Sequence, residues 1–435
     1  MIMDALRKCL RLKITSVLRQ RILTKRFWSS KPPASLTSLI NSALADYKDL
    51  QLAPLKIKSC SIGGSFSRAH LEYELITVKD NNDLVLCENF SNIYSQGFSA
   101  LRQSVGNVGV GFFDSPTGNE NGYFYALSAL RNFLIELDHH EMCLKQRNPY
   151  GDAFDKQTEV VVAVLLTNHL LSRLVYGNRY LISNDYKGRP VKCPCLKPLD
   201  CASLINYGQT GLGCEEIWYG HPDIVLVPPR FSYIPLCFIG DDPEDELQED
   251  EGILTKDCLQ ENCRSTDICE VKGAKLIFEK CAEQILSQAI TFSFCEANAA
   301  YADGKGLFSP TLVPSLVLTP LHYYIVMYDY ENDILLSSGH QPASLWDESG
   351  VRFNLSAILQ IWMVLNHCFF GPKLNDTLLK DFSQSCNFHK ILKELQVFDK
   401  TKDISYSPSF RQKETSKAKT KKHFMLYSEY IKLDK

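Results

Sequence analysis

The sequence has no apolar run long enough to cross a membrane and no recognisable secretory signal. Its longest continuous apolar run, Val160 to Leu166, is far shorter than the roughly 18 to 20 residues that a membrane helix needs. We therefore expect no transmembrane segment and an intracellular protein. In that setting the sixteen cysteines are expected to be reduced thiols rather than a disulfide framework.

Several catalytic and nucleotide-binding motifs are also missing. The chain has no Gly-x-Ser-x-Gly nucleophile elbow. The glycine-rich stretch Val105 to Gly111 lacks the Gly-x-Gly-x-x-Gly order, so we interpret it as a turn rather than a phosphate-binding loop. No internal repeat is apparent. These absences argue against an elbow-type hydrolase, a dinucleotide-binding enzyme and a repeat protein.

Acidic residues are absent from Ala5 to Ala45, where nine lysines and arginines occur. Residues 1–31 form an arginine-rich, presequence-like segment that resembles a mitochondrial transit peptide. A basic surface helix or a nucleic-acid-binding arm is the alternative. We therefore predict a mitochondrial matrix location. The nucleus is the alternative, because the segment 401–435 is a second basic stretch and is expected to be disordered.

Acidic residues are concentrated instead between Asp241 and Glu251, where they fill eight of eleven positions. This run predicts a solvated, disordered loop over 240–262. The rest of the composition is ordinary: 435 residues, of which 45% are hydrophobic and 22% charged, fit a globular protein of two or three domains.

The order of the expected elements divides the chain into regions. Residues 36–150 form an N-terminal region of unknown fold, 151–335 a core, and 336–400 a helical extension. Hydrophobic patterning predicts helices over 123–141, 158–174, 275–294 and 357–370, and strands over 312–319 and 323–328. Residues 217–219 and 222–227 are expected to pair as a hairpin through Gly220-His221.

Two short motifs in the core carry chemistry. Asp223 follows Pro222 at the start of an apolar strand, and Glu270-Val271-Lys272 reads as part of another strand. Because alternate side chains of a strand share a face, Glu270 and Lys272 would point the same way. Two carboxylates beside an ammonium group are what a hydrolase needs to hold a hard divalent cation near a phosphodiester. Either motif alone is short enough to occur by chance.

The order and context of these motifs resemble the PD-(D/E)XK, or restriction-endonuclease-like, nuclease superfamily between residues 158 and 328. Gly220-His221-Pro222-Asp223 fits the Gly-x-x-Asp of its RecB-type exonuclease branch. Gln288 to Phe292 is similar to that branch's Gln-x-x-x-Tyr, with phenylalanine in place of tyrosine. The gap between Asp223 and Glu270 is longer than the motif usually has. The resemblance implies an α/β fold in which helices flank a central mixed sheet.

The resemblance also implies roles for individual residues. Asp223 and Glu270 would bind Mg2+ or Mn2+ with the carbonyl of Val271, and Lys272 would act on the attacking water or the developing negative charge. Glu159 would approach the metal from a helix, and Gln288 would orient Lys272 or the phosphate. The implied function is metal-dependent nuclease activity on DNA. RNA is the less favoured substrate. The alternative is a catalytically inactive nuclease-fold module that binds nucleic acid or protein.

Cysteine and histidine groups offer other metal candidates. Cys193, Cys195, Cys201 and Cys214 could bind zinc, but their spacing is not the standard Cys-x2-Cys pairing, and buried or loop thiols are the favoured interpretation. The segment Asp138-His139-His140-Glu141 is interpreted as the solvated end of a helix, because adjacent residues on a helix point apart.

Overall fold

The computed structural model describes twelve parts of the chain: residues 34–78, 84–106, 120–145, 159–175, 180–195, 201, 203–226, 234–238, 266–302, 310–341, 343–350 and 352–406. For residues 266–277 only the helical backbone is described. The predicted presequence 1–31, the acidic loop 240–262 and the tail beyond residue 406 lie outside the described residues.

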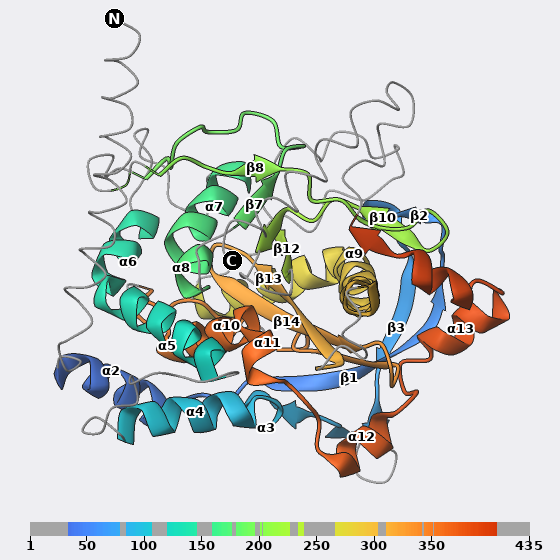
Figure 1. Cartoon of the computed structure of the whole chain (residues 1–435), viewed down its shortest axis with the longest axis horizontal. Coiled ribbons are helices and arrows are strands. Elements are labelled where there is room, and N and C mark those ends of the chain that lie inside the picture. Colours follow the sequence, from blue (N-terminus) through green and yellow to red (C-terminus); the bar gives the residue numbers. More distant parts are fainter. Residues whose placement is uncertain are drawn as a thin grey trace, which may run out of the picture.

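A large mixed sheet forms the centre of the molecule, as the α/β prediction requires (Figure 1). Its strand order is β3-β1-β15-β14-β13-β12-β11-β7-β8, and β6 and β16 pair with β1 and β14. The pairs β12–β13 and β7–β8 are parallel, and the other described pairs in this sheet are antiparallel. The strands are β1 (Gln51–Cys60), β3 (Leu71–Leu75), β6 (Glu88–Asn89), β7 (Tyr180–Ser183), β8 (Tyr207–Gly208), β11 (Ile224–Leu226), β12 (Ile234–Phe238), β13 (Leu312–Leu318), β14 (His322–Asp329), β15 (Ile334–Ser337) and β16 (Ala343–Ser344).

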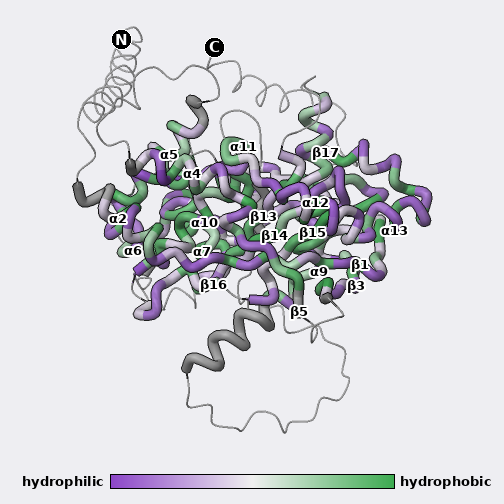
Figure 2. The backbone as a smooth tube through the Cα atoms, turned by 90° about the horizontal axis from the view of Figure 1, so that it is seen from below, coloured by the Kyte–Doolittle hydropathy of each residue, from purple (hydrophilic) through white to green (hydrophobic). Residues whose placement is uncertain are grey.

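Both faces of the sheet are buried, which explains why its central strands are apolar at nearly every position. In β14, Tyr323, Ile325 and Met327 pack into one hydrophobic core. The alternate residues Tyr324, Val326 and Tyr328 pack into a second core on the other face. The period of two that separates the cores follows from the pleat of the strand. Figure 2 shows this hydrophobic centre around β13, β14 and α10, with a largely hydrophilic periphery at α13.

Helices cover each face of the sheet (Figure 1). One core packs against α9 (Thr266–Ala302) and α13 (Phe388–Glu394). The other packs against α2 (Ala34–Ala45), α3 (Phe90–Ile93), α4 (Ser95–Gly106), α5 (Glu120–Ile135), α6 (Leu137–Lys145), α7 (Glu159–Leu166), α8 (Ser172–Leu174), α10 (Leu355–Leu365), α11 (His367–Phe370) and α12 (Asp376–Phe382). The segment Thr167–Leu171 between α7 and α8 is a π-helical turn, so residues 159–174 form one continuous helix.

Two small sheets complete the described structure. One has the order β17-β9-β10-β2, with β17 (Ser405–Tyr406), β9 (Leu212–Gly213), β10 (Trp218–Gly220) and β2 (Gly64–Ser65). The other pairs β4 (Thr77–Val78) with β5 (Leu84–Val85). Short 3-10 turns occupy Phe66–Arg68 and Phe398–Asp403. Trp218 stacks on Phe388 with ring centroids 5.2 Å apart, which anchors the four-stranded sheet near α13.

Most of the predicted helices and strands are confirmed. The expected helix 158–174 begins at Glu159, and 123–141 and 357–370 each contain two consecutive helices. The strands β13 and β14 occupy the predicted ranges. Strand β1, from the N-terminal region, and β15, which crosses the predicted boundary between the core and the extension, join the same sheet as the core strands. None of the described helices combines the length and apolar character that a membrane span needs.

The predicted hairpin through Gly220-His221 is wrong. Strand β10 pairs with β9 and β2, whereas β11 pairs with β7 and β12 in the large sheet. Pro222 lies between the strands, lacks a backbone N–H and favours an extended conformation for His221. The chain therefore passes from one sheet to the other instead of turning back on itself.

The predicted strand at Glu270-Val271-Lys272 is also wrong, because these residues belong to helix α9. The surrounding sequence is rich in strong helix formers, including Ala274, Lys275 and Leu276, and it contains no proline. The strand beside β11 is instead β12, which pairs antiparallel with β11 and parallel with β13. Its sequence, Ile-Pro-Leu-Cys-Phe, contains neither an acidic residue nor a lysine.

Gly213 lies where the backbones of β9 and β10 approach closely. Its φ is +114°, and a Cβ there would lie 2.0 Å from the carbonyl oxygen of Trp218. Gly350 also has a positive φ, +63°, but a Cβ there meets nothing within 4 Å. We expect Gly350→Ala to lower the free energy of unfolding by about 1–2 kcal/mol, the ordinary cost of a left-handed residue.

Gly213→Ala should lower the free energy of unfolding by about twice that amount or more, because the cost of the backbone clash is added to the cost of the left-handed backbone conformation. Urea denaturation of the two variants measures the difference. Equal costs would mean that β9 and β10 are not packed as closely as the structure has them.

Candidate metal-binding sites

Glu159 is the first residue of the 159–174 helix, and its carboxylate is held by a tyrosine from another part of the chain. The hydroxyl of Tyr186 donates a hydrogen bond to Glu159 Oε1 at 3.1 Å. Tyr186 lies in the loop between β7 and β8, residues 184–206, which we call the 184–206 loop. The helix start and this loop are therefore joined at a carboxylate.

Asp223 reaches the same tyrosine from the start of β11. Its backbone carbonyl accepts a hydrogen bond from Ser183 N at 2.8 Å, which fixes it beside the end of β7. Its carboxylate lies near Tyr186 as well, since it contributes with that of Glu159 to raising the pKa of the tyrosine. Both carboxylates therefore lie near the same hydroxyl group. The structure thus brings together Glu159 and Asp223, two of the predicted site residues.

The tyrosine hydroxyl adds no charge to this carboxylate pair. Burial raises the pKa of Tyr186 well above its usual value, and the nearby carboxylates of Asp223 and Glu159 raise it further. Tyr186 therefore stays neutral and has a single proton to donate between the two carboxylates. Oxygen ligands with net negative charge are what a hard divalent cation requires.

Three basic residues occur in the same loop as Tyr186. Lys187, Arg189 and Lys192 follow Tyr186 in the 184–206 loop, and all three are exposed. The Arg189 guanidinium lies 5.5 Å from the ring centroid of Tyr207, a cation–π arrangement that holds it near the sheet edge. Exposed cations in a loop suit a polyanionic ligand such as a phosphodiester backbone.

The other predicted site residues are placed differently. Gln288 is buried in α9, with 3% of its surface exposed, and none of the contacts that the structure describes joins it to Glu159 or Asp223. Glu270, Val271 and Lys272 belong to the same helix, in its part without described side chains. On a helix, residues two positions apart do not share a face, so the reason for expecting Glu270 and Lys272 side by side no longer holds.

Sequence reasoning missed Tyr186 altogether. It is one of twenty tyrosines, it belongs to no recognised motif, and the residues that it joins are far from it in sequence. Only the pairing of β7 with β11 brings the start of the 184–206 loop beside Asp223.

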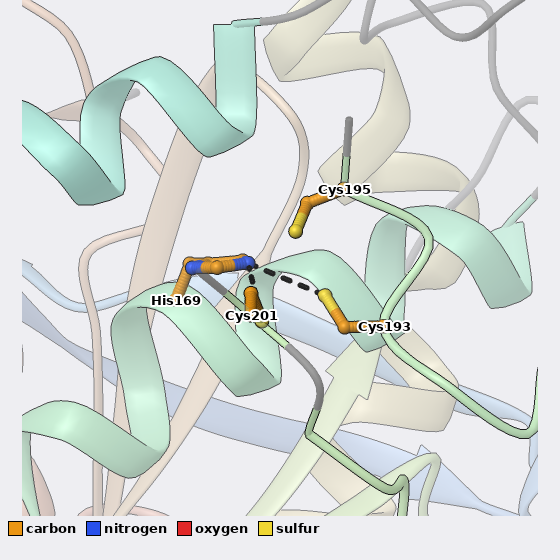
Figure 3. Close-up of side chains that lie close together, drawn as sticks. All are labelled: His169, Cys193, Cys195 and Cys201. Atoms are coloured by element: carbon orange, nitrogen blue, oxygen red, sulfur yellow. Dashed lines mark hydrogen bonds between the residues drawn. The ribbon is translucent and has the colours of Figure 1, made fainter. Parts of the chain in front are cut away.

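A second cluster of metal-binding side chains lies further along the 159–174 helix (Figure 3). His169, Cys193, Cys195 and Cys201 each offer a ligand atom, and these atoms lie within 4.8 Å of one another. His169 Nε2 is 3.3 Å from Cys193 Sγ and 3.7 Å from Cys201 Sγ. All four residues are buried, with His169 only 1% exposed. Figure 3 shows their side chains pointing toward one another.

The backbone on both sides of this cluster is specifically arranged. His169 lies in the π-helical turn, a departure from α-helical geometry that is frequent at functional sites. Arg173 Nε donates to the carbonyl of Asn168 at 2.9 Å within this distorted region. In the 184–206 loop, hydrogen bonds from Cys193 N to Ser203 O and from Ile205 N to Val191 O, each 3.1 Å, fold the chain back on itself. This fold brings Cys201 to the other two cysteines.

Cys214, the fourth cysteine of the zinc group considered from the sequence, is not in this cluster. Its sulfur lies 3.8 Å from the carbonyl oxygen of Lys400, in the other hydrophobic core. His169 takes the fourth position. No spacing rule could have found it, because it lies within an apolar helix and 24 residues before Cys193.

The segment 138–141 is not a solvated helix end, as the sequence had suggested. His140 and Glu141 are 2% and 3% exposed, and Glu141 accepts a hydrogen bond from Phe353 N at 2.8 Å. The ring of His140 lies 5.8 Å from that of His169. Burial, together with the charge of Arg173, lowers the pKa of His140 to about 3, so it stays neutral beside the cluster.

A hollow of about 720 Å³ lies elsewhere, lined by residues that include Asp138, Asp347 and Arg352. It contains none of the predicted site residues and neither metal-binding group. The candidate sites are therefore defined by converging side chains and not by this hollow.

Comparison with known proteins adds nothing to this picture: no family model, curated protein or solved structure matches the chain.

Proposed function

We propose that this protein is a metal-dependent nuclease of the PD-(D/E)XK kind, with Glu159 and Asp223 as carboxylate ligands of Mg2+ or Mn2+. The observation that carries the proposal is the convergence of these two carboxylates, from a helix start and a strand start, on the hydroxyl of Tyr186. The resemblance implies metal ligation for Asp223, and for Glu159 an approach to the metal site from its helix.

The order of elements around the pair supports the same proposal. The 159–174 helix is followed in the sheet by β7, β11 and β12, which are antiparallel neighbours, then by α9, and then by β13, which is parallel to β12. A helix, antiparallel strands, a second helix and a further strand are the order that the resemblance implied.

The chemistry follows from the donor set. A hard cation held by Glu159 and Asp223 would supply Lewis-acid assistance to the attack of water on a phosphodiester. Tyr186 orients both carboxylates through its hydroxyl. The exposed cations Lys187, Arg189 and Lys192 would bind backbone phosphates on either side of the scissile bond. DNA is the favoured substrate, with RNA as the alternative.

The first prediction concerns the carboxylate pair. Asp223→Asn and Glu159→Gln each remove a charged ligand with almost no change in shape, so nuclease activity with Mg2+ or Mn2+ should fall by about a hundredfold or more. The measurement is cleavage of single- and double-stranded DNA and RNA. Glu348→Gln is the matched control, because that carboxylate is 95% exposed, and it should behave as wild type. Equal rates in all four proteins would refute the proposal.

The second prediction concerns Lys272, whose role rests on the resemblance alone. An ammonium group that stabilises charge developing on the phosphorane contributes strongly to the rate. Lys272→Ala should therefore lose about a hundredfold in cleavage rate while keeping its affinity for DNA within a few-fold. If the rate stays within threefold of wild type, Lys272 has no place in the site.

The third prediction concerns Tyr186. In Tyr186→Phe the carboxylate of Glu159 loses the hydrogen bond from the tyrosine hydroxyl, so without metal the protein should unfold at a lower temperature. Mg2+ should then raise the unfolding temperature more than it does in wild type, because a cation bound by the carboxylates would offset more of their mutual repulsion. Tyr207→Phe is the control: its hydroxyl donates to the carbonyl of Pro190 at 2.9 Å. Identical Mg2+ shifts in both variants would contradict the carboxylate site.

A second candidate function is a nuclease-fold module that binds nucleic acid without cutting it. The observation that favours it is the sequence of β12, which lies beside β11 and has no acidic residue or lysine. This candidate predicts that wild type binds DNA but does not cleave it with either metal ion. Asp223→Asn would then bind as tightly as wild type or more tightly, because a negative charge has been removed.

A further inference from the structure

The cluster of His169, Cys193, Cys195 and Cys201 has the composition of a structural zinc site. Three thiols and one imidazole form a Cys3His set, which holds zinc in closed tetrahedral sites. Sulfur ligands select zinc over magnesium or calcium, so this cluster has a different metal preference from the Glu159–Asp223 pair. No disulfide involves the three cysteines, whose thiols are free.

The measured distances agree with that coordination. In a tetrahedral site with Zn–S near 2.3 Å and Zn–N near 2.0–2.1 Å, sulfur and nitrogen ligands lie about 3.6 Å apart. The two distances from His169 Nε2, 3.3 Å to Cys193 and 3.7 Å to Cys201, lie on either side of this value. A single nitrogen atom close to two sulfurs is poorly explained by hydrogen bonding, because an imidazole N–H has one hydrogen to share.

The groups around the ligands are those that a metal site uses. Asn168 Nδ2 lies 3.1 Å from Cys201 Sγ and donates to it, as neighbours of zinc thiolates do. The Nε2 atom of His169, not Nδ1, faces the sulfurs.

The position of the cluster suggests what the metal does. The 184–206 loop touches the 159–174 helix at two points: Tyr186 on Glu159, and the three cysteines on His169. These points are ten residues apart on the helix, or about 15 Å along its axis. A bond at the second point would restrict the movement of the loop segment that carries Tyr186, Lys187 and Arg189.

We propose that His169, Cys193, Cys195 and Cys201 bind one structural zinc ion that fastens the 184–206 loop to the 159–174 helix. The site does not depend on the proposed nuclease activity, since its ligands and the carboxylate pair share no residue. Zinc ligation would fix the middle of the loop, and the loop in turn would hold Tyr186 near the carboxylates.

The first measurement is the metal content of the full-length protein, purified without chelators. Inductively coupled plasma mass spectrometry gives the zinc content per chain. Wild type should contain about one zinc per chain, and Cys214→Ser should contain the same amount, because that buried cysteine lies in the other core. Cys193→Ser, Cys201→Ser and His169→Ala should lose most of the zinc. His169→Cys should retain it, since a thiolate replaces the imidazole as fourth ligand.

Two further measurements keep the test decisive if a ligand variant folds poorly. Cobalt added to metal-free wild type should give the visible absorption of tetrahedral thiolate-bound Co2+. Zinc should also protect the 184–206 loop from protease, and a chelator should remove that protection. Wild type that neither contains zinc nor gives the cobalt spectrum overturns the proposal. So does a Cys193–Cys195 disulfide found in the protein kept under reducing conditions, or a Cys214→Ser variant that loses its zinc.

Discussion

The nearly complete burial of the 159–174 helix is the constraint on which both metal-binding groups depend. Its apolar residues, from Val160 to Leu174, lie in one core between the sheet and the other helices, as expected for a helix that is apolar on almost every side. Polar groups on such a helix need partners. Glu159 accepts a hydrogen bond from Tyr186, and His169 lies beside three cysteines. Both partners come from the 184–206 loop, so a single loop satisfies the polar groups at both points.

The two groups lie along the same helix but differ in the chemistry of their ligand atoms. Glu159 and Asp223 offer oxygen ligands, and the loop that contacts them carries exposed cations, a combination that suits an exchangeable hard cation and a phosphate backbone. His169 and the cysteines offer a closed set of soft ligands without an open position, which suits a permanent structural ion. A loop that carries residues of a binding site gains precision when it is fixed to a rigid element. In the proposed arrangement, the zinc site would therefore support the carboxylate site without taking part in its chemistry.

What the sequence predicts well is what local patterning determines. The 159–174 helix and strands β13 and β14 are long apolar segments with both faces buried, so their type and place follow from their residues. The hairpin at Gly220 and the strand at Glu270 were wrong because pairing partners and helix propagation are not local properties. The sequence singles out Asp223 and Glu159 as candidate site residues, because Asp223 belongs to a short motif and both occur in the expected order of elements. It does not single out Tyr186 or His169, because each acquires its role only when β7 and β11 pair and the 184–206 loop folds back onto the helix.

The most direct test of this account is a crystal structure of the full chain grown with Mn2+, with anomalous scattering measured at the zinc and manganese edges. The account predicts two peaks beside the same helix: manganese between Glu159 and Asp223, and zinc within the triangle of Cys193, Cys195 and Cys201 next to His169. A map in which both positions are empty, or in which manganese binds away from Asp223, would contradict it.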